Sequence, residues 1–217
     1  MSGGFPDSPR LMKAALISMG ALIPIPRLIV LQYNPAELSR TLEPDFEKTG
    51  DTPTGTNLLA GPAIETLSMT ARISAVDQLQ ANQDSATLLG INPQLAKIEM
   101  MMFPSATTII EEVAQLALGI LEVVPPEAPL TVFVWGPTRV LPVQITSYSV
   151  SETMHDQLLN PIDAEVTLGM KVLTYRDFSP TDAGFYLYLA NLAQRELFAT
   201  VGTIQSGAGI IAGALGK

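Results

Sequence analysis

The chain has 217 residues, no cysteine, one histidine and a formal net charge of −9. These numbers exclude disulfides and cysteine-based metal sites, leave too few imidazoles for most zinc or non-haem iron centres, and argue against a nucleic-acid partner. Charged residues make up only 15% of the chain, against 47% hydrophobic residues. We therefore expect other protein subunits to cover much of the surface.

The two ends of the chain are expected to lie outside the folded domain, which we place at residues 11–199. Residues 1–10 lack the basic start and apolar run of a secretory signal, so we interpret them as a flexible arm. Residues 200–217 are rich in Gly and Ala, and we interpret them as a tail that is mobile or docked on a partner. A membrane anchor is the alternative, because Gly209-x-x-x-Gly213 has the spacing of packed membrane helices. Large apolar residues are sparse there, which argues against that anchor.

The first third of the chain predicts strands separated by one long loop. Short apolar or alternating runs give strands at 13–19, 27–32, 38–42 and 64–76. The stretch Glu43–Pro62 is rich in Pro and Gly turns, and a loop of this length in a compact domain is usually functional. We expect it to contact a partner through Asp51, Thr52, Pro53 and Thr54.

The middle of the chain predicts helices. Apolar residues at helical spacing mark Pro93–Met102 and Thr107–Val123, and Ser105 is the expected N-cap of the second helix. A strand follows at Leu130–Trp135, and a last helix is expected over Asp182–Thr200.

The longest alternating pattern lies in the stretch Thr138–Thr174, which predicts an antiparallel hairpin of two long strands joined by Thr153–Pro161. Even-numbered residues of its second strand, from Ile162 to Val172, are apolar, so they form one face. The apolar parity of the first strand changes near residues 146–147, which indicates a bulge. The polar face of the second strand is our candidate subunit interface, with Asp163, Glu165, Thr167 and Lys171.

The sequence offers no credible catalytic constellation, cofactor site or metal site. His155 and Asp156 could act as a base and its orienting acid beside Ser151 or Thr153, which leaves a hydrolase-like enzyme as an alternative. Adjacent residues at a strand end point to opposite faces, so we expect a solvated loop histidine instead.

Five short motifs together resemble the tube-domain proteins of contractile injection systems, which are relatives of phage tail tubes and baseplate hubs. The similarity covers about residues 15–195. The motifs are Gln32-Tyr33-Asn34-Pro35 followed by Leu38-Ser39-Arg40, Pro93-Gln94-Leu95 with Glu99-Met100, Phe133-Val134-Trp135-Gly136, the strand end Tyr148–Glu152, and Leu159-Asn160-Pro161-Ile162.

The resemblance implies an α+β, mostly antiparallel β fold of the tube type, a β-barrel or β-sandwich with flanking helices. It implies a non-enzymatic homo-oligomer, six subunits to a ring, that lines a channel and stacks with other rings. The implied partners are inner-tube, hub, spike and baseplate proteins, and the implied role is a tube or baseplate layer that joins the inner tube to the central spike. The particle would assemble in the cytoplasm, with release or association with membranes such as thylakoids through the particle. Members often carry a basic residue after the last motif, where this chain has Asp163.

Overall fold

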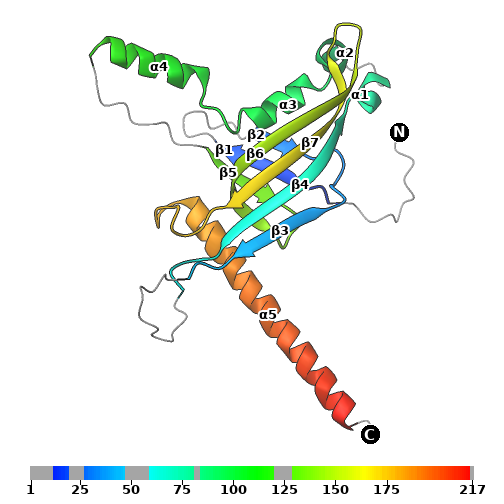
Figure 1. The fold of residues 1–217 in the computed structure, drawn as a ribbon, viewed down its shortest axis with the longest axis vertical. Coiled ribbons are helices and arrows are strands. Elements are labelled where there is room, and N and C mark those ends of the chain that lie inside the picture. The colour runs from blue at the N-terminus through cyan, green and yellow to red at the C-terminus, as the bar shows by residue number, and fades with distance from the viewer. Residues whose placement is uncertain (1–11, 20–26, 47–58, 81–83, 120–128, 216–217) are drawn as a thin grey trace.

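The computed structural model describes residues 12–19, 27–46, 59–80, 84–119 and 129–215. Their seven strands form one antiparallel sheet in the order β2-β1-β5-β6-β7-β4-β3 (Figure 1). The strands are β1 (Ala15–Met19), β2 (Arg27–Val30), β3 (Leu38–Glu43), β4 (Ile64–Ser74), β5 (Leu130–Val134), β6 (Val140–His155) and β7 (Pro161–Val172). The helices are α1 (Val76–Gln80), α2 (Asp84–Leu89), α3 (Asn92–Glu99), α4 (Ala106–Ala117) and α5 (Ala183–Leu215).

The fold is therefore α+β with a mostly antiparallel sheet, as the sequence predicts. The sheet does not close on itself, because β2 and β3 lie at its two ends. Within the described residues it is one open sheet, so the expected barrel or two-sheet sandwich is not confirmed.

The hairpin of β6 and β7 forms the centre of the sheet and has the predicted register. Even-numbered residues of β7 from Ala164 to Val172 are buried, whereas Glu165 and Thr167 are exposed. The predicted bulge is also present: Ile145 lies opposite Met170 and Ser147 lies opposite Gly169, so Thr146 is the extra residue. The bulge restores contact with the core for the apolar residues that follow it on β6.

The hydrophobic core lies on the inner face of this twisted sheet. Its largest fully buried side chains include Phe133, Leu16, Leu141, Leu168 and Met170. Helix α3 adds Leu95 and Ile98, which are both buried. Burial of such side chains stabilises the fold by roughly 1.5–3 kcal/mol each.

Helix α3 begins as expected near a proline, but without a side-chain cap. Pro93 occupies its first turn, and Ile91 rather than a polar residue stands at the N-cap. The backbone N–H of Ile91 instead donates to the carbonyl oxygen of Pro161 at 2.8 Å. Tertiary contact with the hairpin thus replaces a local cap.

The other helices differ from prediction mainly at their ends. Ser105 caps α4 as predicted, since its Oγ accepts from the N–H of Thr108 at 3.2 Å. Helix α5 continues to Leu215, past the predicted end at Thr200. No proline interrupts this segment, and its alanines favour a helix despite the glycines. Helices α1 and α2 were not predicted, because five or six residues are too few to show a helical period.

Helix α5 is fixed to the sheet by a buried carboxylate. Glu65 on β4 is buried, with Oε1 2.5 Å from Nε of Arg40 and Oε2 2.7 Å from Nη2 of Arg195 on α5. Beyond this contact the helix extends away from the sheet, and α4 projects on the other side (Figure 1). Leu197 and Phe198 of α5 are exposed.

Candidate functional site

The candidate interface residues on β7 fall into two groups. Asp163 is only 6% exposed. Its Oδ1 accepts from Nε of Arg72 at 3.0 Å, and its Oδ2 accepts from Nη2 of Arg72 at 2.9 Å and from the hydroxyl of Thr153 at 3.2 Å. These bonds, first of all the one from Arg72, lower the pKa of Asp163 despite its burial. Asp163 thus ties β7 to its two neighbouring strands.

The other three β7 residues lie on the outer face of the sheet. Glu165 pairs in register with Arg72, Thr167 Oγ1 lies 3.2 Å from Oγ1 of Thr70, and Lys171 lies between Thr66 and Gln144. Their contact with a neighbouring subunit remains a prediction. Residues Asp51, Thr52, Pro53 and Thr54 lie outside the described residues.

The outer face around Thr167 is a surface of small hydroxyl side chains. Neighbouring strands place serines and threonines beside one another in register, and all of them are exposed. They are Ser68 and Thr70 on β4, Thr167 on β7, and Ser147 and Ser149 on β6. Small hydroxyls bind water well and offer little apolar area, so this face resists tight docking.

The hydrolase arrangement does not form around His155. The ring Nε2 lies 3.1 Å from Oε2 of Glu152, while the hydroxyl of Thr153 donates to Asp163. The carboxylate of Asp156 accepts hydrogen bonds from the turn that follows it. The base, the acid and the candidate nucleophile Thr153 thus each have a different partner.

Asp156 organises the turn between β6 and β7. Its Oδ1 accepts from the N–H groups of Leu158 at 2.7 Å and Asn160 at 2.8 Å, and its Oδ2 accepts from Nδ2 of Asn160 at 2.8 Å. The bond from the Asn160 side chain contributes most to a lowered pKa of Asp156. Leu159 has a φ of 64°, a conformation that a leucine rarely adopts. The turn is therefore held in one strained shape.

Helix α2 and the residues after it support this turn. Nδ2 of Asn160 also donates to the carbonyl oxygen of Leu88 at 3.3 Å. Gly90 has a φ of 57°, and a Cβ there would lie 2.1 Å from the carbonyl oxygen of Pro161. Only glycine allows this close approach of the two backbones.

The supported turn exposes two leucines, which we call the leucine tip. Leu158 is 78% exposed and Leu159 is 80% exposed. Leu88, Leu89 and Met154, which are also exposed, extend this apolar end of the hairpin. The sequence prediction placed a solvated His155 here and missed the leucines. An apolar pair between Asp156 and Asn160, inside a turn, is the signal that could have revealed them.

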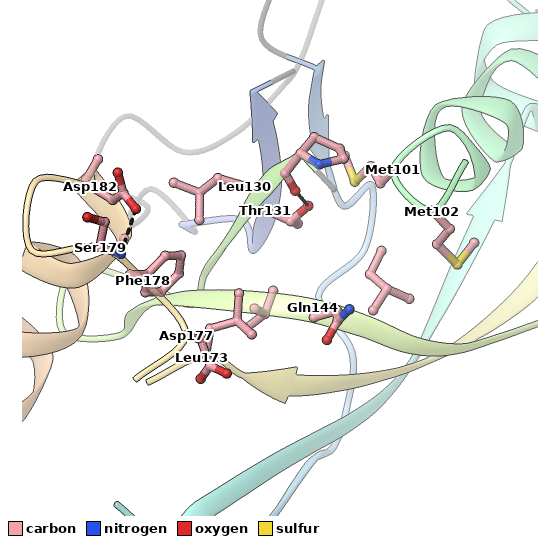
Figure 2. A pocket seen from close by; sticks show the side chains of 15 residues that line it. Met101, Met102, Leu130, Thr131, Gln144, Leu173, Asp177, Phe178, Ser179 and Asp182 are labelled. Carbon is pink, nitrogen blue, oxygen red and sulfur yellow. Dashed lines mark hydrogen bonds between the residues drawn. The ribbon is translucent and has the colours of Figure 1, made fainter. Parts of the chain in front are cut away.

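A pocket of about 860 Å³ lies at the opposite end of the hairpin, and we call it the base pocket. Figure 2 shows that it is bordered by segments far apart in sequence: the end of α3, the start of β5, the first part of β6, and the loop that enters α5. Its apolar lining includes Met101, Met102, Leu130, Leu173 and Phe178.

The two carboxylates of the base pocket are already bonded within the chain. Oδ2 of Asp182 accepts from the N–H of Ser179 at 2.8 Å (Figure 2). Oδ2 of Asp177 accepts from the N–H of Thr174 at 2.7 Å and from its hydroxyl at 2.8 Å. These bonds shape the loop, and both carboxylates remain in the lining of the pocket beside its apolar side chains.

The described part of the chain contains no group of three His, Cys, Asp or Glu residues that could hold a metal ion. Among the same residues, no helix has the length and apolar character needed to span a membrane.

Comparisons with known proteins give only remote likenesses. No protein-family model matches the sequence, and no curated protein matches it. Among solved structures, a chain of the baseplate of the anti-feeding prophage, symmetrised six-fold, is 15% identical with a TM-score of 0.28; the match covers 76% of this chain and 93% of that chain. A chain of a native gene transfer agent virion is 13% identical with a TM-score of 0.27; the match covers 73% of this chain and 90% of that chain. A chain of the tail of an empty gene transfer agent particle is 14% identical, also with a TM-score of 0.27 and coverages of 73% and 90%.

Proposed function

We propose that this chain is a structural, non-enzymatic subunit of a tail-like injection particle. It forms a ring of six copies, as a tube or baseplate layer between the inner tube and the central spike. The observation that carries the proposal is the leucine tip, a rigid apolar end that the chain itself leaves exposed. Soluble monomers rarely leave such a cluster open to water.

Helix α4 supports the same proposal. Its apolar side chains include Ile109, Ile110, Val113 and Leu116, and all four are exposed. A helix with an uncovered apolar stripe is stable mainly when another surface packs on that stripe. An assembly supplies such a surface.

Two of the motifs that resemble tube-domain proteins have structural roles here. Asn34 accepts from the N–H of Ala14 at 3.0 Å and donates to the carbonyl oxygen of Met12 at 2.8 Å, which holds the start of β1. Asn160 holds the turn of the hairpin and touches Leu88. Both asparagines position strands, as a scaffold protein requires.

The outer hydroxyl face is the surface that suits a channel. It combines serines and threonines with the oppositely charged Glu165 and Lys171, and Arg72 there is engaged by Asp163. Such a face lets a passing molecule slide without strong binding. The side of the sheet that carries the core and the projecting helices would then lie towards the outer parts of the particle.

The mass of the purified full chain tests this proposal. We expect a discrete species of about six times the chain mass of 23.2 kDa, visible as rings by negative-stain electron microscopy. The variant His155→Ala should form the same species, because the ring is exposed and its hydrogen bond is to Glu152, three residues away on the same strand. A sharp monomer at high concentration that also fails to enter any particle would contradict the proposal. A hydrolytic activity that His155→Ala abolishes would favour the enzyme.

A further inference from the structure

Helix α5 packs on the rest of the chain through one of its sides, which we call the sheet-facing side. On that side Tyr188 contacts Tyr175, with ring centroids 6.0 Å apart, and Nη2 of Arg195 lies 2.7 Å from Oε2 of Glu65. Asn191, which lies between them in sequence, is 7% exposed. These positions are three and four residues apart, so they share one face of the helix. The anchored part of α5 ends near Arg195, because the residues from there to position 203 are exposed.

The other side of α5 is an apolar stripe that the chain leaves exposed. Tyr186 and Leu197 are each 60% exposed, and Val201 is 44% exposed. Ala190 and Ala193, which complete this apolar stripe on the anchored part, are exposed as well. The sheet-facing residues each have a member of the stripe two positions away, which is more than half a turn of a helix. In the sequence the same spacing continues with Ile204, Ala208, Ile211 and Leu215.

The outer half of α5, Leu197–Leu215, extends away from the sheet (Figure 1). It contains no Asp, Glu, Lys or Arg, so it offers no ion pair to a charged partner. It also contains four glycines, which disfavour an isolated helix. A helix of this kind with an uncovered apolar stripe gains stability when another surface packs along it. The surface that suits it is uncharged and elongated, as another helix is.

The chain itself carries a matching surface on the same helix. Along the outer half, small residues continue the spacing of the sheet-facing side, and each lies two positions from a member of the apolar stripe. They are Gly202, Ser206, Gly209 and Gly213. Gly202 does not have a positive φ, and a Cβ there would meet nothing within 4 Å in its own chain. Neither backbone conformation nor packing within one chain therefore requires glycine at this position, whereas small residues let a second helix approach closely.

We propose that the apolar stripe of one copy packs along the small-residue side of α5 in a second copy, with the two helices parallel. The contact joins two different surfaces of one helix, so it is heterologous and can repeat around a closed ring. Copies at the same height fit together, because Val201 then stands level with the gap between Ala199 and Gly202 of its neighbour. The inference rests on the proposed function and deepens it by naming a segment that joins neighbouring copies.

A second copy is the occupant because one helix carries both surfaces, at the same spacing and over the same length. The ion pair of Arg195 with Glu65 fixes the direction of α5 relative to the sheet. Copies related by a ring axis therefore present their outer halves side by side and parallel. Each outer half is roughly 27 Å long at 1.5 Å per residue. The ring also holds the helices at a high effective concentration, so the contact is effective without being strong in isolation.

Disulfide cross-linking tests this contact, because the chain has no native cysteine. The full chain carries Ala199→Cys on the small-residue side and Val201→Cys on the apolar stripe, and both positions are exposed. Their Cβ directions diverge, so the two cysteines do not pair within one chain. Oxidation of assembled rings should give a ladder of linked chains, with at least tenfold more product than either single variant gives.

The pair Ala199→Cys/Leu118→Cys is the matched control. Leu118 is 79% exposed, but it lies at the end of α4. Equal ladders from the two pairs would overturn the proposal, and so would abundant dimers of the single variant Val201→Cys or the absence of a ladder in rings that form normally. The choice of occupant would be overturned by capture of Val201→Cys by a different protein of the particle. Flotation of the wild-type chain with phosphatidylcholine vesicles, abolished by Val201→Gln, would overturn it as well.

Sedimentation separates this contact from the rest of ring formation. The double variant Leu197→Gln/Val201→Gln removes apolar area from the stripe and keeps residues that favour a helix. We expect its rings to dissociate at a concentration at least tenfold higher than wild type, with an unchanged circular dichroism spectrum, while Leu118→Gln matches wild type. Rings of wild-type stability in the double variant refute the α5 contact and leave the proposed function standing. Absence of rings in the wild-type chain refutes the proposed function and, with it, this inference.

Discussion

The inner and outer faces of the β4–β7–β6 ladder differ in what their side chains do. Alternate residues of β7 on the inner face are apolar and fully enclosed, as Leu168 shows at 0% exposure. One residue away, Thr167 faces solvent beside Thr70 and Ser149. The inner face therefore supplies the stability of the fold, and the outer face is free to serve as a surface.

Each face has one acidic residue that departs from this division. Glu65 is buried on the inner face between Arg40 and Arg195. Asp163 is enclosed on the outer face by Arg72 and Thr153. Both carboxylates join separate elements of the fold, so the division between faces is one of role rather than simply of polarity.

The largest expected effect is on the inner face. Leu168→Asp places a carboxylate among apolar side chains, which costs several kcal/mol even after partial protonation. This is comparable with the whole stability of a typical domain, roughly 5–15 kcal/mol. We expect the variant to be unfolded or strongly destabilised in denaturant titrations followed by circular dichroism. A native-like midpoint would show that the register of β7 is wrong.

Glu65→Gln should have the next largest effect. The change removes the charge that holds Arg40 and Arg195 together, but both guanidinium groups can turn partly to solvent, so we expect a loss of about 1–3 kcal/mol. Helix α5 should also loosen, giving faster limited proteolysis near its start. Arg195→Met is the control, because it leaves Glu65 paired with Arg40 and should cost less stability than Glu65→Gln.

The alternating hairpin could be predicted from the sequence because its signal is local. Side-chain direction on a strand depends only on parity, so the faces of β7 and the bulge at Thr146 followed directly from residue order. The cap of α4 at Ser105 was predictable for the same reason.

The candidate site could not be predicted in the same way, because it depends on contacts between distant residues. The base pocket combines Met101, Ile145 and Phe178, and no sequence pattern links them. The direction of Leu158 depends on hydrogen bonds that Asp156 makes only once the turn has formed. Helix α5 continues to Leu215, past its predicted end, because the alanines of the Gly- and Ala-rich segment favour a helix.

Asp163→Asn tests how the enclosed carboxylate on the outer face affects the pH dependence of stability. The folded state lowers the pKa of Asp163, chiefly through the hydrogen bond from Arg72. The ionised form therefore stabilises the fold above the ordinary aspartate range of about pH 4, and this contribution is lost as the pH falls through the lowered folded pKa. We expect Asp163→Asn to be less stable than wild type at pH 7, with the difference shrinking below about pH 4. Glu165→Gln, on the same face but exposed, should leave the pH dependence of unfolding nearly unchanged.

The smallest effect should come from Thr167→Asp, which introduces the same residue as Leu168→Asp, one position away on β7. Thr167 loses only its contact with the hydroxyl of Thr70, and the new carboxylate remains hydrated. Exposed substitutions of this kind usually change the free energy of unfolding by less than about 0.5 kcal/mol. A denaturant titration beside Leu168→Asp measures the contrast between the two faces.

Assembly of the Thr167→Asp variant is a separate measurement. If the hydroxyl face is a subunit contact, Thr167→Asp will fold normally yet weaken ring formation. If the face is open to a channel, the substitution will be tolerated in both measurements. Equal destabilisation by the two aspartates would remove the distinction between the faces, because it would mean that β7 is enclosed on both sides.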